Sequence, residues 1–192
     1  MISSSNIKWL QDGRLVSVVL LVWVFFVTVA PAQVPAPSEQ MVKAAFLVNF
    51  PKYVDWPAEA FATTNSPIVI AVLGEAKVAD ELQKIIAGRT VNGRSLVLKR
   101  LVAGEEPGLC HILFIAAAEQ PHSSGMFAKL KGSNVLTVGE SDDFIESWQI
   151  INLARRDRKI AVEVNLTAAD HARIKISSKL LSVANVVKGK PK

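Results

Sequence analysis

The chain begins with a hydrophobic segment of the length that secretory signal peptides have. Residues 15–29 contain thirteen apolar residues and two polar ones, and the charges before them are two basic and one acidic. The small residues of Ala30-Pro31-Ala32 follow, which fits the pattern that signal peptidase accepts. The sequence therefore predicts a signal peptide over residues 1–32 that is cleaved after Ala32.

The alternative to cleavage is an uncleaved membrane anchor. A helix that spans the hydrocarbon core needs about 20 apolar residues, and this run is shorter. We therefore expect an exported protein, without stable membrane insertion after cleavage. Residues 33–40 are expected to form a flexible exit segment, and the basic residues 188–192 a disordered tail.

Helical spacing of apolar residues starts after Ser38. From Glu39 to Asp55 they recur every three or four positions, which predicts a helix with one buried face and Ser38 as its N-cap. Pro51 lies inside this segment, has no amide hydrogen and crowds the carbonyl of Leu47. The helix should therefore kink or restart at this proline.

From residue 68 onward, short apolar runs alternate with amphipathic segments. The runs are continuous and rich in β-branched residues, as in strands that are buried on both faces. The dipeptide Asn92-Gly93 favours a tight turn with positive φ. Alternation of strand and helix requires crossover connections, and therefore a parallel sheet with helices on its faces. The predicted strands are 68–73, 96–101, 111–116 and 135–139, and the predicted helices are 78–87 and 126–130.

The last third of the chain has a different pattern. Segments 148–154 and 159–165 are predicted to form an antiparallel hairpin around a basic tip, because the second segment alternates apolar and polar residues. Thr167 gives a capping pattern for a short helix, and Ser177 or Ser178 for a final one. The inward stripe of that final helix would be Leu180, Leu181, Ala184 and Val187.

These patterns together predict an α/β fold. It would be a single three-layer domain over residues 41–187, with a largely parallel sheet, helices on both faces and an antiparallel hairpin at one edge.

The charge and composition of the chain restrict the classes of partner that it could bind. The chain has 22 Lys and Arg against 17 Asp and Glu, a formal net charge of +5, and removal of Lys8, Arg14 and Asp12 with the leader leaves +4. The anions accessible to an exported domain are lipid head groups, cell-wall polymers and acidic protein surfaces. Nucleic acid is therefore not expected as a partner. The single cysteine, Cys110, excludes a disulfide within the chain, and we expect its thiol to be buried and inert.

Signals for catalysis are weak. Gly74 ends a strand before a helix, but a dinucleotide fingerprint needs further glycines that are missing. Three adjacent residue pairs contain a nucleophile or a base, yet none supplies a nucleophile, a base and an orienting group together. These pairs are Cys110-His111, His122-Ser123 and Asp170-His171. We therefore expect no enzymatic activity, no cofactor and no metal site.

Two sets of residues are candidates for binding a partner. Phe144, Ile145 and Trp148 are apolar residues in an acidic, irregular segment, where they form either a flap packed on the sheet edge or a contact patch. Arg155 and Arg156 lie at the hairpin tip, where they are either solvated or contact an acidic partner or a membrane face.

A small ligand would be expected at the carboxyl ends of the parallel strands, away from these two sets of residues. Ligands of parallel sheets bind beyond the carboxyl ends of the strands, which here are Gly74, Ala117 and Gly139. Lys179 is a further candidate for ligand binding.

Six blocks of the chain, taken in order, match the pattern of one known family. The resemblance extends over about residues 41–187, and ordered blocks are more specific than any single motif above. The first block is an aromatic helix that ends in a Tyr-Val-Asp-Trp-Pro run. That block is Val42-Lys43-Ala44-Ala45-Phe46-Leu47 with Asn49-Phe50 and Lys52-Tyr53-Val54-Asp55-Trp56-Pro57, and the others are Ile70-Ala71-Val72-Leu73-Gly74, Thr90-Val91-Asn92-Gly93-Arg94, Cys110-His111-Ile112-Leu113-Phe114-Ile115, Val135-Leu136-Thr137-Val138-Gly139 and Ile176-Ser177-Ser178-Lys179-Leu180-Leu181. Together they resemble the YfiR-like periplasmic proteins of Gram-negative bacteria.

The resemblance implies a compact α/β domain, often dimeric, without enzymatic activity. The best understood relative binds the periplasmic sensor domain of an inner-membrane diguanylate cyclase and represses it, which lowers cyclic di-GMP and biofilm formation. Other members accompany histidine kinases or outer-membrane receptors. For this chain the resemblance implies a periplasmic regulator of a diguanylate cyclase or another membrane sensor, either as a monomer or as a homodimer. The alternative is a periplasmic small-ligand binding protein that serves a kinase or receptor system.

The chain departs from the family pattern at two positions. Pro51 replaces a small residue in the opening helix. Ala71 stands where relatives often have a second cysteine, able to form a disulfide with the one matched by Cys110. The resemblance therefore does not extend to redox control through a disulfide within this chain.

Overall fold

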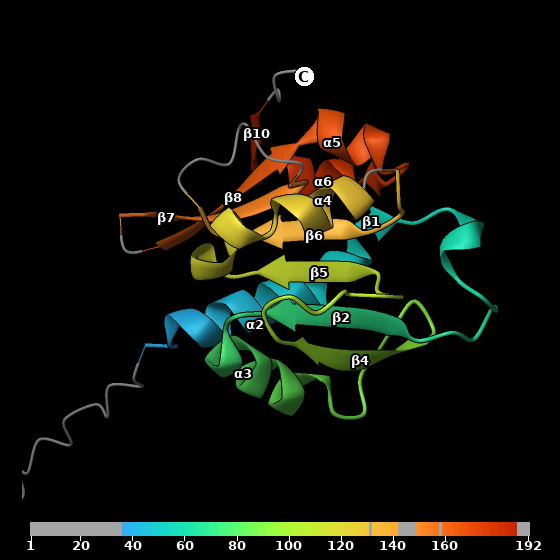
Figure 1. Ribbon diagram of the computed structural model, residues 1–192, viewed down its shortest axis with the longest axis horizontal. Helices are drawn as coiled ribbons and strands as arrows, with labels where there is room; N and C mark the ends of the chain where they lie inside the picture. The colour runs from blue at the N-terminus through green and yellow to red at the C-terminus, as the bar shows by residue number, and fades with distance from the viewer. Residues whose placement is uncertain (1–35, 131, 142–148, 158, 188–192) are drawn as a thin grey trace, which may run out of the picture. The chain divides into compact units, whose positions relative to one another are not determined.

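The computed structural model describes residues 36–130, 132–141, 149–157 and 159–187 (Figure 1). The helices are α2 (Glu39–Asn49), η1 (Phe50–Lys52), η2 (Ala58–Ala60), α3 (Ala76–Ile86), η3 (Ala117–His122), α4 (Ser124–Leu130), α5 (Leu166–His171) and α6 (Ser178–Leu181), where η denotes a 3₁₀-helix. The strands are β1 (Val54–Asp55), β2 (Ile68–Leu73), β3 (Thr90–Val91), β4 (Arg94–Leu101), β5 (Ile112–Ile115), β6 (Leu136–Gly139), β7 (Ile151–Arg156), β8 (Lys159–Asn165), β9 (Lys175–Ile176) and β10 (Asn185–Val187).

One mostly parallel sheet organises the domain, with the strand order β10-β8-β7-β6-β5-β2-β4-β3. The pairs β4–β2, β2–β5, β5–β6 and β6–β7 are parallel, whereas β7–β8 and β3–β4 are antiparallel. The predicted α/β fold is thereby confirmed. In addition, β10 pairs in parallel with β8, so the hairpin lies one strand inside the edge of the sheet.

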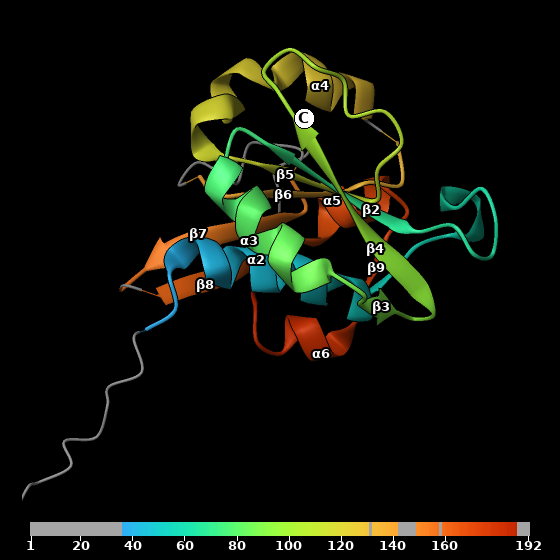
Figure 2. The same ribbon diagram turned by 90° about the horizontal axis from the view of Figure 1, so that it is seen from below.

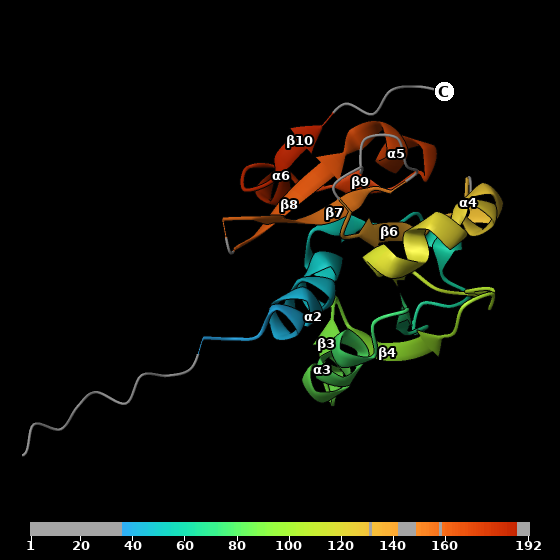
Figure 3. The ribbon, with the colours of Figure 1, turned by 60° about the vertical axis from the view of Figure 1, so that its left-hand side comes forward.

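Alternating side chains of β2 show why the sheet is buried on both faces. Ile68, Ile70 and Val72 belong to the core that includes α2 and α3, whereas Ala71 and Leu73 belong to the core beneath α4. Figures 2 and 3 show the same three layers, with α2 and α3 on one side of the sheet and α4 on the other. Each face is therefore closed by helices, as a parallel sheet requires.

The opening helix ends earlier than its apolar spacing predicts. Ser38 caps α2, since its hydroxyl accepts a hydrogen bond from the Met41 amide at 3.2 Å. The α-helix stops at Asn49, and Pro51 lies in the 3₁₀ turn η1, which confirms the predicted restart. The extension of the helix to Asp55 is wrong, because Val54–Asp55 pairs with Lys175–Ile176 as an antiparallel strand.

Two predictions at the end of the chain are also corrected. The cap of α5 is Asn165 rather than Thr167, because the Asn165 side chain accepts a hydrogen bond from the Ala168 amide at 3.1 Å. Ser177 caps α6 as predicted, but this helix ends at Leu181. Residues 185–187 pair with β8 instead of continuing the helical stripe.

At the amino end of β5, a stack of side chains fixes the loop that follows Trp56. The His111 ring is buried and stacks on Phe61 at a centroid distance of 4.4 Å, and Trp56 packs edge-on against both rings. The Arg94 guanidinium lies 3.7 Å from the centre of the Phe61 ring. Arg94 also donates hydrogen bonds to the carbonyls of residues 63 and 66.

The neutral form of His111 satisfies both of its ring nitrogens. Its Nδ1 accepts a hydrogen bond from the Val69 amide at 3.0 Å, so the proton lies on Nε2, which is 3.1 Å from the Ala60 carbonyl oxygen. Burial lowers the pKa of His111, and the positive charge of Arg94 lowers it further, although the hydrogen bond to Ala60 opposes the shift. Protonation would require Nδ1 to release the Val69 amide.

We predict that His111 makes the fold less stable in mild acid. The unfolded chain takes up a proton near pH 6.5, whereas the folded chain resists it, so the contribution of His111 is complete above about pH 6.5 and is lost as the pH falls below that value. The melting temperature of wild type should therefore drop between pH 7.5 and pH 5.5 by more than that of His111→Asn. Equal drops in the two proteins would contradict the assignment.

Candidate functional site

The neighbouring strands β2 and β5 send their outgoing connections to opposite faces of the sheet. β2 continues into α3 on one face, whereas β5 continues through η3 into α4 on the other. Their arrowheads point the same way in Figure 1, so both connections start at one edge. Such a switch point is where open α/β sheets bind ligands. The fold thus places the first candidate site beyond Leu73 and Ile115.

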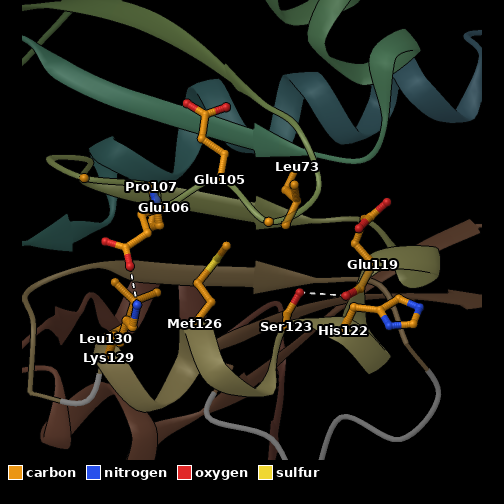
Figure 4. Close-up of a pocket in the computed structure, with 12 residues that line it drawn as sticks. Leu73, Glu105, Glu106, Pro107, Glu119, His122, Ser123, Met126, Lys129 and Leu130 are labelled. Carbon is orange, nitrogen blue, oxygen red and sulfur yellow. Dashed lines mark hydrogen bonds and ion pairs between the residues drawn. The ribbon is translucent and has the colours of Figure 1, made fainter.

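A cavity of about 320 Å³ lies at this edge, on the α4 face. It is bounded by the end of β2, the connection between β4 and β5, and the segment from η3 to α4. Figure 4 shows Leu73 and Met126 pointing into it from opposite sides. The lining residues are Leu73, Gly104, Glu105, Glu106, Pro107, Gly108, Glu119, His122, Ser123, Met126, Lys129 and Leu130. Its volume falls at the lower end of the range for small-molecule sites.

The β4–β5 wall of the cavity is held by hydrogen bonds of its own. The Lys99 ammonium donates to the Pro107 carbonyl at 2.9 Å. The Glu105 carboxylate turns back and accepts a hydrogen bond from the Val102 amide at 3.2 Å. Glu106 forms an ion pair with Lys129 of α4, which joins this wall to the helix across one end of the cavity (Figure 4).

Glu119 lines the other end of the cavity, over the end of β2. Gly74 has φ of +84°, and a Cβ atom built on it would lie 2.3 Å from Cγ of Glu119. A side chain at Gly74 would therefore collide with the stem of Glu119 and strain the backbone. Gly74, which the sequence makes a candidate for ligand binding, thus leaves the space that the Glu119 side chain occupies.

Gly139 has a comparable role at the end of β6. A Cβ atom there would lie within 2.5 Å of the amide group of Gln149, a residue that is 1% exposed. The chain itself thus fills the space above Gly139. Gly74 also lines a separate cavity of about 350 Å³ on the α3 face. Gly139 and Ala117 are not among the residues that line the α4-face cavity. Their assignment to a ligand site stays a prediction.

A buried lysine connects this edge to the opening helix. Lys43 is 6% exposed and forms ion pairs with Glu39 at 2.7 Å and with Glu140, which follows β6. The other oxygen of the Glu140 carboxylate accepts a hydrogen bond from the Ala117 amide at 3.0 Å. Glu39 also lies 3.4 Å from the guanidinium of Arg155. These charges join α2, the end of β6, the start of η3 and the hairpin.

The pKa shifts of Lys43 and Glu39 both favour the charged forms of these two groups. Burial by itself would lower the pKa of Lys43, but hydrogen bonds and charges from Glu140 and Glu39 raise it above its ordinary value. The hydrogen bond from Lys43 lowers the pKa of Glu39 despite its partial burial, and Arg155 adds to this effect. A buried ammonium with two carboxylates is stable only while all partners are present.

Of the residues predicted to bind a partner, two lie in the described part of the chain. The Arg155 side chain is 71% exposed despite its contact with Glu39, and Arg156 pairs with Glu163 at 3.0 Å. Phe144, Ile145 and Trp148 lie outside the described residues. Lys179 is exposed on α6 and lines none of the described cavities.

Cys110, His111 and Ser123, which belong to residue pairs that could suggest hydrolysis, each have contacts of their own. Cys110 belongs to the core beneath α4, whereas the His111 ring binds Val69 and Phe61. The Ser123 hydroxyl donates to the Glu119 carbonyl at 2.6 Å, which joins η3 to α4. None of these groups is arranged as a nucleophile beside a base.

Two further features concern metals and membranes. Within the described ranges, no three His, Cys, Asp or Glu side chains come together in a way that could hold a metal ion. None of the helices in the same ranges has the length and apolar character needed to cross a bilayer.

Comparison with known proteins gives a match that covers most of the chain. The model of the YfiR/HmsC-like family matches residues 40–185. The chain belongs to the YfiR/HmsC-like family. No curated protein matches it.

Family membership makes the surroundings of Cys110 relevant. In this YfiR/HmsC-like chain, Cys110 and Ala71 lie in the same buried cluster. Burial raises the pKa of the Cys110 thiol to about 12, although Lys99 lowers it slightly. This confirms the expected buried thiol, which is protonated at neutral pH.

We predict that Cys110 is unreactive in the folded protein. With the thiolate suppressed and the side chain buried, a disulfide reagent such as 5,5′-dithiobis(2-nitrobenzoate) should label the native protein at pH 8 only as fast as it unfolds. The urea-unfolded chain, as the control, should be labelled completely. Stoichiometric labelling of native protein within the mixing time would show an accessible thiol.

We also predict that Lys43 is a principal determinant of stability. Lys43→Met leaves the buried Glu140 carboxylate without its cation, and the free energy of unfolding in urea should fall by roughly 3–5 kcal/mol. Lys84→Met is the matched control, because Lys84 forms an exposed pair with Glu81. Its effect should stay within about 0.5 kcal/mol.

A double variant separates loss of charge pairing from loss of packing. Lys43→Met combined with Glu140→Gln removes the uncompensated carboxylate and keeps an oxygen for the Ala117 amide. It should be more stable than Lys43→Met alone. If the double variant is less stable, then the ion pair does not explain the effect of Lys43.

Proposed function

We propose that this protein is a non-catalytic regulator in the periplasm, which binds the periplasmic sensor domain of an inner-membrane signalling protein. The observation that carries the proposal is the family match over residues 40–185. The signal peptide predicted over residues 1–32 supports the compartment. The partner we infer is a diguanylate cyclase, which the protein represses and so lowers cyclic di-GMP.

The described hairpin offers a surface that suits such a partner. Arg155 and Arg156 place two guanidinium groups near the turn at Asp157, where the Arg155 side chain is mostly exposed. Arginine is common at protein interfaces and pairs well with carboxylates. Phe144, Ile145 and Trp148, which precede β7 in the chain, remain candidates for the apolar part of the contact.

Repression by such a module requires a difference in affinity. A bound protein shifts its partner between two states only by the ratio of its affinities for them. The regulator must therefore bind the inactive sensor domain more tightly than the active one. Loss of the contact would release the cyclase without any change in the cyclase itself.

The expected result in the native host is a rise in cyclic di-GMP when the gene is deleted. Complementation with the full chain should reverse the rise, whereas a chain that lacks residues 1–32 should not, because it cannot reach a periplasmic domain. Cyclic di-GMP is measured in cell extracts. An unchanged level on deletion, or rescue by the form without residues 1–32, would contradict the proposal.

Charge reversal at the hairpin tests the surface. Arg155→Glu should weaken repression, and Lys77→Glu, an exposed lysine of α3, is the matched control with the same change in charge. Both proteins should keep their melting temperatures within a few degrees of wild type. Equal repression by the two variants would remove Arg155 from the contact.

A further inference from the structure

The α4-face cavity combines an apolar interior with a carboxylate that has no partner. Leu73, Met126 and Leu130 provide the apolar lining. Of the three acids in the lining, Glu106 is paired with Lys129 and Glu105 binds the Val102 amide. Among the described residues, Glu119 has no ion pair or hydrogen bond at its carboxylate.

The position of Glu119 is built into the fold. Its stem lies over Gly74, where a Cβ atom would collide with it, and its main-chain carbonyl accepts the Ser123 hydroxyl. The fold therefore places Glu119 at the end of β2: Gly74 leaves space for its stem, and Ser123 binds its backbone. Figure 4 shows it at the opposite end of the cavity from the Glu106–Lys129 pair.

The charge of this lining is opposite to that of the protein. The cavity has three carboxylates and one lysine, in a chain whose formal net charge is +5. A carboxylate beside apolar side chains favours a cation that also has an apolar body. The cationic group of such a ligand pairs with the carboxylate, and its body packs against the apolar side chains. A metal ion would need further oxygen ligands, which the described residues do not bring together here.

We propose that this cavity is a binding site for a small organic cation, a primary amine with an apolar body, whose ammonium group binds Glu119. The body of the ligand packs between Leu73 and Met126. Met126 adapts to it, since methionine is unbranched and flexible. The site does not depend on the proposed cyclase partner, although occupancy would be a signal that such a regulator could transmit.

Three probes of similar size test the proposal on the full mature chain. They are 2-phenylethylamine, the neutral 2-phenylethanol and the anionic phenylacetate, each titrated by calorimetry. The amine should bind with a dissociation constant below about 10 mM, roughly tenfold more tightly than the alcohol, and phenylacetate should not bind measurably. Absence of amine binding at that concentration, or equal binding of amine and phenylacetate, would overturn the site.

Variants then locate the binding. Glu119→Gln should reduce the affinity for the amine to that for the alcohol and leave the alcohol unchanged. Glu75→Gln, in the cavity on the α3 face, is the matched control and should bind the amine as wild type does. Met126→Trp, whose larger side chain fills the cavity, should abolish binding of both the amine and the alcohol. If Glu119→Gln and Glu75→Gln bind the amine equally, Glu119 is not the partner of the ammonium group.

Failure of this site and failure of the proposed function are distinguishable. Calorimetry uses the purified protein alone, whereas repression is measured as cyclic di-GMP in cells. A protein that binds no amine and still represses the cyclase would overturn only the ligand site.

Discussion

The arrangement at the carboxyl edge of the sheet depends on the buried ammonium group of Lys43. It lies between two carboxylates that come from different parts of the chain, Glu39 and Glu140. Because the lysine is removed from water, the desolvation cost is recovered only when both carboxylates are in place. Glu140 in turn holds the Ala117 amide, and Glu39 contacts Arg155. One buried charge thus links α2, η3 and the hairpin through contacts on the same edge.

Two glycines at the same edge are used in a way that differs from a phosphate-binding loop. Such loops use glycine so that the backbone can approach an anion. In this protein the space above Gly74 is filled by the stem of Glu119, and the space above Gly139 by Gln149. At the end of β2 the edge therefore presents the side-chain carboxylate of Glu119 rather than bare backbone amides. This is the physical reason that the α4-face cavity suits a cation.

Local sequence patterns predict the features that depend on neighbouring residues, but they do not predict contacts between segments that are distant in the chain. The continuous apolar run 68–73, the cap at Ser38 and the turn at Asn92-Gly93 were all predictable, because each depends on its own residues. The strand at Val54–Asp55 was not, since its partner is more than a hundred residues away. Lys43 follows Glu39 by four residues, a spacing that allows an ion pair along a helix, but the link to Glu140 required the fold. Glu119 had no signal in the sequence at all.

The cavity and the hairpin are connected through contacts that can be followed one by one. Glu119 belongs to the same short 3₁₀-helix as Ala117, whose amide is held by Glu140. Glu140 pairs with Lys43, Lys43 with Glu39, and Glu39 with Arg155. A row of contacts couples the cavity to the hairpin only when the ligand prefers one of two arrangements of these groups. A ligand bound to Glu119 acts on η3, and η3 is tied to the rest of the edge by the Glu140 carboxylate. The most direct described route from an occupied cavity to the hairpin surface therefore passes through the Lys43 ammonium.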